Sequence, residues 1–352
     1  MVYINGAASI SPQNSINFDE FFKEIKVYED LFLKSLTPDY KKYMKPIEAR
    51  RMSKTVKNGI ICSQIAMNEA ETEIPDAIIF GTALGIVSDT EKFLEKMLYD
   101  NEQYLTPTSF IQSTHNTVAA QIAHRIKCRN YNFTYVNRGF SFESALLDAI
   151  IHLKEGKKNI LTGGGDEMTE HYYKIIKKTG IFKQDETKNT DLLKYETSGA
   201  LCGEAVSFFV LSDDKKTETY AELKDLRMLY KPENNSEIIS EIESFLESSN
   251  LQCSDIDLII TGYSGNKGGD EVFDNILSEK FAGTPAAYFK HLCGEFQTAS
   301  SFALWLSANI LKYRKYPDFI KLNDKIPEKI SNILIYNHYF NINHSLILLS
   351  ES

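Results

Sequence analysis

Short apolar runs alternate along the chain with longer segments of helical periodicity, and this alternation constrains the fold more than any single motif does. The runs lie at residues 77–80, 133–136, 159–161, 206–211, 258–260, 333–336 and 346–349. Runs of this length that are bounded by polar segments are typical of buried β-strands. Because strand-like and helical patterns alternate, the sequence predicts an α/β architecture.

The clearest helical pattern follows Gly139. Apolar residues recur there at helical spacing, namely Phe142, Ala145, Leu146, Ala149, Ile150 and Leu153. This spacing places them on one face of an α-helix. Ser141 is the expected N-cap, and Glu143 is favourably placed in the first turn, where the helix dipole stabilises negative charge. A second helix is expected near residues 302–311.

The length of 352 residues fits two or three domain-sized units or one large α/β body, and 43% apolar residues can form a sizeable core. The charged segment 213–218 follows the strong apolar run 206–211 and marks the expected join between two halves. We predict halves at residues 1–212 and 213–352. A similar order of strands and helices in both halves is typical of a duplicated fold.

Charge and cysteine content exclude several classes of function. A net charge of −9 argues against a broad nucleic-acid footprint and against binding to an anionic membrane surface. The five cysteines are widely spaced and odd in number, which indicates a reduced, cytosolic protein without a disulfide framework or a zinc site. No signal peptide is evident, and no window approaches the ~18 apolar residues that a membrane span requires.

Several further segments occur in a recognisable order. They are residues 2–12, Arg-Arg-Met-Ser at 50–53, Phe-Gly-Thr-Ala-Leu-Gly at 80–85, Gly-Gly-Gly-Asp-Glu at 163–167, Gly-Ala-Leu-Cys-Gly-Glu-Ala at 199–205 and Lys-His-Leu-Cys-Gly-Glu at 290–295. Each motif is short, but together they span nearly the whole chain. In this order the chain resembles the β-ketoacyl synthase family. The resemblance implies a thiolase-like α/β fold of two similar βαβαβ halves that form a layered α/β/α/β/α body.

The catalytic positions of that family are altered here. The family's nucleophilic cysteine stands at the start of a buried helix, where the helix dipole favours the thiolate, and its counterpart is Gly139. The two catalytic histidines, which stabilise a developing enolate or oxyanion, correspond to Gly262 and Glu295. The resemblance therefore implies a chain that is inactive by itself. Ser141 and Ser144 are weaker candidates for a replacement nucleophile than for local structural roles.

Supporting features of the family have changed as well. Lys290 is retained, but the acid expected in the following helix is Leu304. The C-terminal loop that carries an oxyanion donor and a gating aromatic residue is shortened to residues 337–343. Glu295 is either a new general base whose pKa is raised by burial or, as we favour, the partner of Lys290 in a structural ion pair.

The segments 106–121 and 137–143 resemble the chain-length factors of aryl polyene and flexirubin pathways, which pair with an intact ketosynthase. The first segment is expected at the dimer interface, near the end of the acyl tunnel. The residues expected to line the tunnel or the interface are Phe110, Ile111, His115, Val118, Phe140 and Phe340. For Phe110, Ile111 and Val118, ordinary core packing is the favoured alternative, and for His115 a local hydrogen bond at a helix start is an equal one.

The resemblance implies a chain-length factor in polyene, polyketide or fatty-acid-like synthesis. Its expected partners are an active ketosynthase, or a second copy of the chain, and an acyl carrier protein. Carrier proteins are acidic, so the binding of one would require a local basic patch on this acidic chain. Arg50 and Arg51 with Lys54 and Lys57, and Lys174 with Lys177 and Lys178, form basic clusters, but solvated helix faces explain them equally well. The alternatives are an active synthase or acyltransferase with a site around Glu295, and a module that binds acyl chains or carrier proteins.

No cofactor is expected. His291 and Cys293 lie close to Glu295 in the sequence, but no second cluster of potential ligands accompanies them. A metal site is therefore disfavoured there. The glycine run 163–165 lacks the Lys-Ser/Thr of a phosphate-binding loop, and a tight turn is the expected structure.

Overall fold

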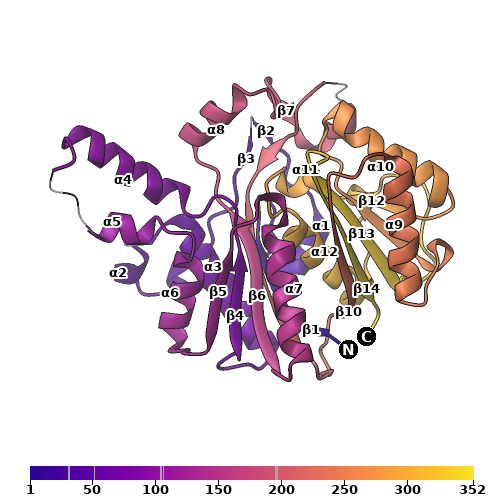
Figure 1. Ribbon diagram of the computed structural model, residues 1–352, viewed down its shortest axis with the longest axis horizontal. Helices are drawn as coiled ribbons and strands as arrows, with labels where there is room; N and C mark the ends of the chain where they lie inside the picture. The colour runs from indigo at the N-terminus through magenta and orange to yellow at the C-terminus, as the bar shows by residue number, and fades with distance from the viewer. Residues whose placement is uncertain (31, 51, 104, 106, 195–196) are drawn as a thin grey trace.

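A ten-stranded mixed sheet runs through the computed structural model, which describes residues 1–30, 32–50, 52–103, 105, 107–194 and 197–352 (Figure 1). Arg51 and Thr106, which belong to segments that carry the family resemblance, lie outside the described residues. Within the sheet, the strands of the N-terminal half follow the order β5-β4-β6-β9-β1 and those of the C-terminal half the order β12-β11-β13-β14-β10.

The strand bounds come from both halves of the chain. They are β1 Tyr3–Ile10, β4 Ala77–Gly81, β5 Tyr131–Tyr135, β6 Asn159–Asp166, β9 Ala205–Ser212, β10 Ala221–Tyr230, β11 Leu258–Thr261, β12 Ala286–Tyr288, β13 Asn332–Tyr339 and β14 Asn343–Ser350. Two small two-stranded sheets pair β2 Glu29–Asp30 with β7 Thr187–Lys188, and β3 Phe32–Leu33 with β8 Cys202–Gly203.

Both halves have the same topology. In chain order, the strands of each half lie as third, second, fourth, fifth and first. The second strand of each half pairs in parallel with the third and the fourth, and the remaining pairs are antiparallel. The halves join through a short antiparallel pairing of β1 and β10, with Tyr3 opposite Glu222 and Ile4 opposite Ala221. This repetition confirms the predicted fold class. The boundary after residue 212 stays a prediction, although β9 ends at Ser212 and β10 begins at Ala221.

Helices form the layers on either side of the strands. The central layer holds α7 Ser141–Lys154 and α12 Ser300–Tyr313, the latter in contact with strands of both halves. Helices α3 Lys54–Glu69 and α6 Thr117–Ile126 cover the outer face of the N-terminal half. Helices α9 Asn235–Ser248 and α10 Lys267–Lys280 cover the outer face of the C-terminal half (Figure 1).

The remaining helices are shorter or lie at the edges. They are α1 Phe18–Lys23, α2 Pro46–Ala49, α4 Val87–Tyr99, α5 Pro107–Gln112, α8 Glu170–Lys177 and α11 Lys290–Cys293, with 3₁₀ turns η1 Tyr40–Lys42, η2 Arg138–Phe140, η3 Asn189–Lys194, η4 Cys253–Asp255 and η5 Asp318–Ile320.

The pleat of the strands sorts their side chains into separate cores. Along β4, Ile79 joins the central core, whereas Ile78 and Phe80 join the core under α3. Along β11, Ile260 faces the central core and Ile259 faces the core under α9 and α10. Because successive strand side chains point to opposite faces, continuous apolar strands mean that both faces of the sheet are covered by helices.

Helix α7 confirms the predicted apolar stripe, since all of its named residues are buried. The expected N-cap was wrong. Ser141 is the first residue of the helix, and the preceding Phe140 occupies the cap position without a side-chain cap bond. The Ser141 hydroxyl instead donates to the carbonyl oxygen of Arg138 at 2.8 Å and accepts from the amide of Asn137 at 2.9 Å, so it stabilises the 3₁₀ turn before the helix.

The predicted turn at residues 163–165 was also wrong, because these glycines lie inside strand β6. A Cβ atom built on Gly163 would lie 2.5 Å from the carbonyl oxygen of Ser207, and one built on Gly164 would lie 2.7 Å from Cδ2 of Phe142. The glycines are therefore explained by the close approach of β9 and α7 to β6. Among the described residues, no helix is both long and apolar enough to cross a membrane.

Candidate functional site

Two positions where the family resemblance expects catalytic side chains are glycines that pack against the end of β13 or the start of β14. A Cβ atom built on Gly139 would lie 2.7 Å from Cβ of Tyr339 and 3.0 Å from Cβ of Asn343. A Cβ atom built on Gly262 would lie 2.2 Å from Oδ1 of Asn337. Any side chain at either position would therefore need the residues around the end of β13 to move.

The third position, Glu295, forms a buried ion pair. Its Oε2 lies 2.6 Å from Nζ of Lys290, and the two side chains are 1% and 0% exposed. Nζ of Lys290 also donates to the carbonyl oxygen of His338 at 3.0 Å. The ion pair favoured by the sequence is therefore present, and it ties α11 to the end of β13.

Local backbone geometry places Glu295 in this position. Gly294 has a φ of 78°, in the left-handed region that favours glycine, and its amide donates to the carbonyl oxygen of Lys290 at 2.7 Å. Beyond this turn, the amide of Glu295 donates to Leu201 at 2.6 Å, and its carbonyl oxygen accepts from Gly203 at 3.2 Å. The chain after α11 is thus anchored to β8, and the carboxylate is directed inward.

Burial dominates the electrostatics of Glu295. It raises the pKa of this carboxyl to about 7, although Lys290 opposes the rise and the charge of Asp270 adds to it. Asp270 is itself buried and accepts hydrogen bonds from the amides of Ser264 and Gly265. A carboxylate that replaces an imidazole here would repel a developing enolate rather than stabilise it.

The imidazoles nearest in sequence to this pair serve other contacts. Nε2 of His291 lies 2.9 Å from the carbonyl oxygen of Phe319, and burial lowers the pKa of His291 to about 3. Nε2 of His338 lies 3.0 Å from the carbonyl oxygen of Gly269, while Nδ1 accepts from the amide of Asn341 at 3.2 Å. Both ring nitrogens of His338 are thus committed to the backbone, and burial holds its pKa well below the usual range.

The structure buries two further acids, Asp166 and Glu143, that the sequence analysis did not single out as site residues. Asp166, at the end of β6, accepts from the hydroxyl of Thr82 through Oδ1 and from the hydroxyl of Thr298 through Oδ2, each at 2.9 Å. Glu143, expected only as a favourable first-turn residue, is fully buried on α7. An acid on the apolar face of a predicted helix, in line with Leu146 and Ile150, was the available signal for Glu143.

The residues expected at the tunnel or interface separate into exposed and buried groups. Phe110 and Ile111 are 57% and 63% exposed, so the core-packing alternative was wrong for both, and His115 is exposed nearby. Val118 is 1% exposed and packs in the core under α3, as that alternative predicts. Phe140 is buried at the start of α7.

Phe340 follows β13 with a left-handed φ of 50° and packs edge-on against Phe182. Ser144, the other serine weighed as a nucleophile, accepts a hydrogen bond from the side chain of Asn137 at 3.1 Å.

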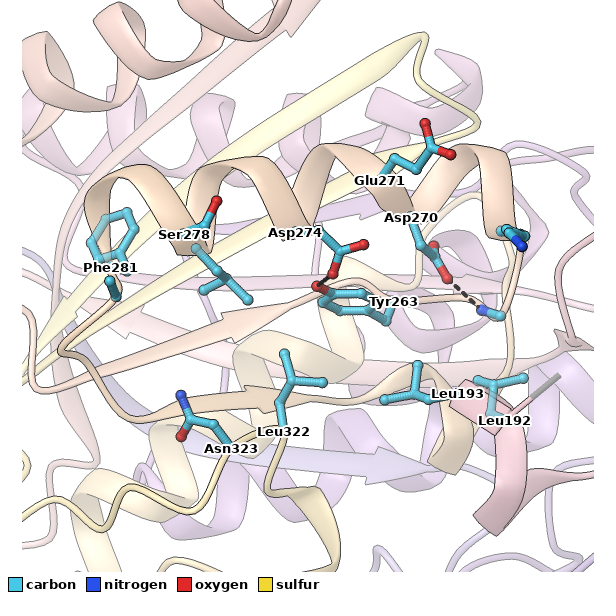
Figure 2. A pocket seen from close by; sticks show the side chains of 14 residues that line it. Leu192, Leu193, Tyr263, Asp270, Glu271, Asp274, Ser278, Phe281, Leu322 and Asn323 are labelled. Carbon is cyan, nitrogen blue, oxygen red and sulfur yellow. Dashed lines mark hydrogen bonds between the residues drawn. The ribbon is translucent and has the colours of Figure 1, made fainter. Parts of the chain in front are cut away.

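A cavity of about 800 Å³ runs along α10, beside the turn that begins at Gly262 (Figure 2). Tyr263 lies in it, and its hydroxyl donates to Oδ1 of Asp274 at 2.6 Å (Figure 2). Leu192, Leu277 and Leu322 supply apolar surface. The buried pair of Lys290 and Glu295 is not part of the lining. Among the described residues, no group of three or more His, Cys, Asp or Glu side chains is arranged to hold a metal ion.

The family model of the β-ketoacyl synthase N-terminal domain matches residues 30–193. Over this segment the chain is similar to that domain. The match includes Gly139 and the exposed segment around Phe110, but it ends before Gly262 and Glu295. For those two positions, the correspondence with the ketosynthase histidines rests on the order of motifs in the sequence. No curated protein sequence matches the chain.

Solved structures extend the likeness of this ketosynthase-like chain to its whole length. The ishigamide ketosynthase/chain length factor is 15% identical with a TM-score of 0.79, and the alignment covers 100% of this chain and 99% of that one. A β-ketoacyl synthase from Burkholderia phymatum STM815 is 15% identical with a TM-score of 0.80 and the same coverage. The ketosynthase ApeO in complex with its chain length factor ApeC, from Xenorhabdus doucetiae, is 14% identical with a TM-score of 0.76, covering 100% and 98%. At these identities the likeness establishes the fold alone.

Proposed function

We propose that this chain is a non-catalytic ketosynthase-like subunit, a chain-length factor, that pairs with an active ketosynthase in type II polyketide-like or polyene synthesis. The partner supplies the cysteine and both histidines. This chain supplies one wall of the shared interface.

The observation that carries the proposal is the packing around Gly139 and Gly262. A Cβ atom at either glycine would come within 3.0 Å of a residue from Asn337 to Asn343. A thiol or an imidazole at these positions would therefore require Tyr339, Asn343 or the side chain of Asn337 to shift. The loss of the expected catalytic side chains is accompanied by loss of the space in which they would work, which is the outcome expected when catalysis is no longer required.

Exposed apolar residues on the N-terminal half support pairing with another chain. Strand β5 lies at the end of the sheet, so one backbone edge is unpaired within the described residues, and its Phe133 is 46% exposed. Ile151 on α7 is 44% exposed. Such an edge strand is a template for pairing with another chain unless it is covered. Phe110 and Ile111 add exposed apolar surface on α5, which lies on the same half of the molecule (Figure 1).

The proposal is tested by expressing the tagged chain together with each intact ketosynthase of its source cell and weighing the purified complexes by native mass spectrometry. We expect a one-to-one complex. Phe133→Lys should abolish it, because a charge would be buried at the edge strand. Tyr230→Lys is the matched control, since Tyr230 is a 63% exposed aromatic residue at the end of β10, and it should leave the complex intact. If the chain forms only a homodimer in the presence of every ketosynthase tested, the heterodimer proposal is wrong.

One observation favours an active enzyme. Burial raises the pKa of Glu295 to about 7, and a carboxyl with such a pKa is suited to general base catalysis. Against it, Glu295 is 1% exposed and does not line the cavity along α10. The purified chain is therefore incubated alone with acyl and malonyl carrier thioesters. Turnover that disappears in Glu295→Gln would support the enzyme. Binding of a carrier protein without a ketosynthase would support a binding module instead.

A further inference from the structure

The cavity along α10 has two walls of different chemistry (Figure 2). The wall formed by α10 is mainly polar and contains Lys267, Asp270, Glu271, Asp274 and Ser278. The facing wall is apolar and contains Leu192 and Leu193 of η3 together with Leu322. The volume of about 800 Å³ lies within the roughly 300–1,000 Å³ of most small-molecule sites. A ligand that matches both walls therefore has an apolar body and a polar group.

The apolar wall is held in place by the fold. The amide of Leu322 donates to the carbonyl oxygen of Ala286 at 2.9 Å. The side chain of the next residue, Asn323, accepts from the amide of Ala286 at 3.2 Å. Leu192 is buried, and its Cδ1 would lie 2.4 Å from a Cβ atom built on Gly265. The cavity is thus formed before any ligand arrives, so binding does not have to order these segments.

One carboxyl group in this cavity is already oriented. The hydroxyl of Tyr263 donates to Oδ1 of Asp274 at 2.6 Å, and Figure 2 shows the two side chains meeting between α10 and the leucines. Burial and the bond to Asp274 raise the pKa of Tyr263 well above its usual range, so the hydroxyl remains a donor. Asp274 is exposed, and its Oδ2 accepts no hydrogen bond from the described residues. That oxygen is available to a donor on a ligand.

The charges of the lining favour a cation at Asp274. Asp270 is buried and already accepts hydrogen bonds from the backbone, whereas Glu271 is exposed one helical turn before Asp274. Lys267 precedes Asp274 by two turns, which is about 10 Å along the helix axis. This distance is about one Debye length at 0.1 M salt, so Lys267 offsets the charge of Asp274 only weakly. A carboxylate or phosphate ligand would be repelled at Asp274.

We propose that this cavity binds a small amphiphilic ammonium compound. The ammonium group donates to Oδ2 of Asp274, and the alkyl chain lies along Leu193 and Leu322. Leu193 is 40% exposed, so covering it removes apolar surface from water. The inference does not depend on the proposed function, because Gly262 and Glu295 are not part of the lining.

The test is a ligand-observed NMR titration of the full chain with hexylammonium, and with hexanol and hexanoate as probes of the same length. We expect hexylammonium to bind most tightly, because it alone can form an ion pair with Asp274. Lengthening the chain from butylammonium to hexylammonium should lower Kd by up to about fourfold per methylene group, because each methylene leaves water for the leucine wall. Equal affinity for hexanoate or for hexanol would overturn the proposal.

Variants locate the binding site. Asp274→Asn should raise the Kd of hexylammonium by about fivefold and leave that of hexanol unchanged. Glu247→Gln, at an exposed acid of α9, changes the net charge equally and should leave both values unchanged. Leu322→Ala should weaken the binding of both probes, which tests the apolar wall even if Asp274→Asn folds poorly. An unchanged Kd in Asp274→Asn and Leu322→Ala, or an equal rise in Glu247→Gln, would show that the ammonium compound does not bind in this cavity.

Discussion

Nζ of Lys290 lies 2.6 Å from Oε2 of Glu295, and neither side chain reaches solvent. Lys290 also holds the carbonyl oxygen of His338, so the pair connects α11 with the end of β13. A buried ion pair of this kind is a weak source of net stability, because desolvation offsets much of the attraction. Removing only one partner is nevertheless costly, since it leaves a buried charge without compensation.

Lys290→Met should therefore destabilise the chain by about 3–5 kcal/mol. The double variant Lys290→Met with Glu295→Leu should recover most of this loss, because it leaves no unpaired charge. Urea unfolding at one pH measures both values. Equal losses in the single and double variants would show that the charges are not coupled.

Gly262→Ala should destabilise the chain by about 2 kcal/mol or more, because overpacking a filled interior forces its neighbours to shift. Its new Cβ would lie 2.2 Å from Oδ1 of Asn337. Gly268→Ala is the matched control, since Gly268 lies in α10 with nothing within 4 Å of a new Cβ. It should be stabilising by about 0.5–1 kcal/mol. Thermal unfolding distinguishes the two variants.

The same packing predicts that restoring the cysteine and the two histidines of the family would not restore activity. The triple variant Gly139→Cys, Gly262→His and Glu295→His should show no condensing activity and reduced stability, because the space is occupied by Asn337 and Tyr339. The measurement is carbon dioxide release from malonyl carrier thioester. Release at a rate typical of an intact ketosynthase would show that the site is open enough for catalysis.

Asp166→Ala should cost about 3 kcal/mol or more, because it leaves several buried donors without a partner. Oδ1 accepts from Thr82, Ala83 and Leu84, and Oδ2 accepts from Thr298. Thr298→Val removes one of these bonds and should cost about 1 kcal/mol. Chemical unfolding of both variants gives the comparison. A smaller loss for Asp166→Ala than for Thr298→Val would refute this role.

His344 should contribute to acid sensitivity. Burial lowers its pKa from 6.5 to about 4, so the folded chain holds it neutral while the unfolded chain takes up a proton below pH 6.5. Its contribution to stability is therefore lost as pH falls from about 6.5 to 4. His344→Gln should reduce the loss over that range, as measured by melting temperature. His171→Gln, at a histidine whose side chain is 67% exposed, should leave the loss unchanged.

The sequence predicted the local elements well where the pattern was strong. The apolar stripe of α7 and the continuous runs of β9 and β14 are all buried in the structure. Strand β10 gave a weaker signal because charged residues interrupt it, and β12 has only three residues. The glycine run in β6 was misjudged because its reason is the close approach of β9 and α7, which is not visible in the local sequence.

The sequence by itself determined which chemistry is missing, because glycine at 139 and 262 has no side chain and glutamate at 295 has no imidazole. Only the tertiary structure decided what replaces it. Gly139 meets Tyr339, and Lys290, which pairs with Glu295, donates to the carbonyl oxygen of His338. These contacts join residues that are far apart in the chain. Their burial, and therefore their charge and the absence of free space between them, depends on how the two halves pack against the central helices.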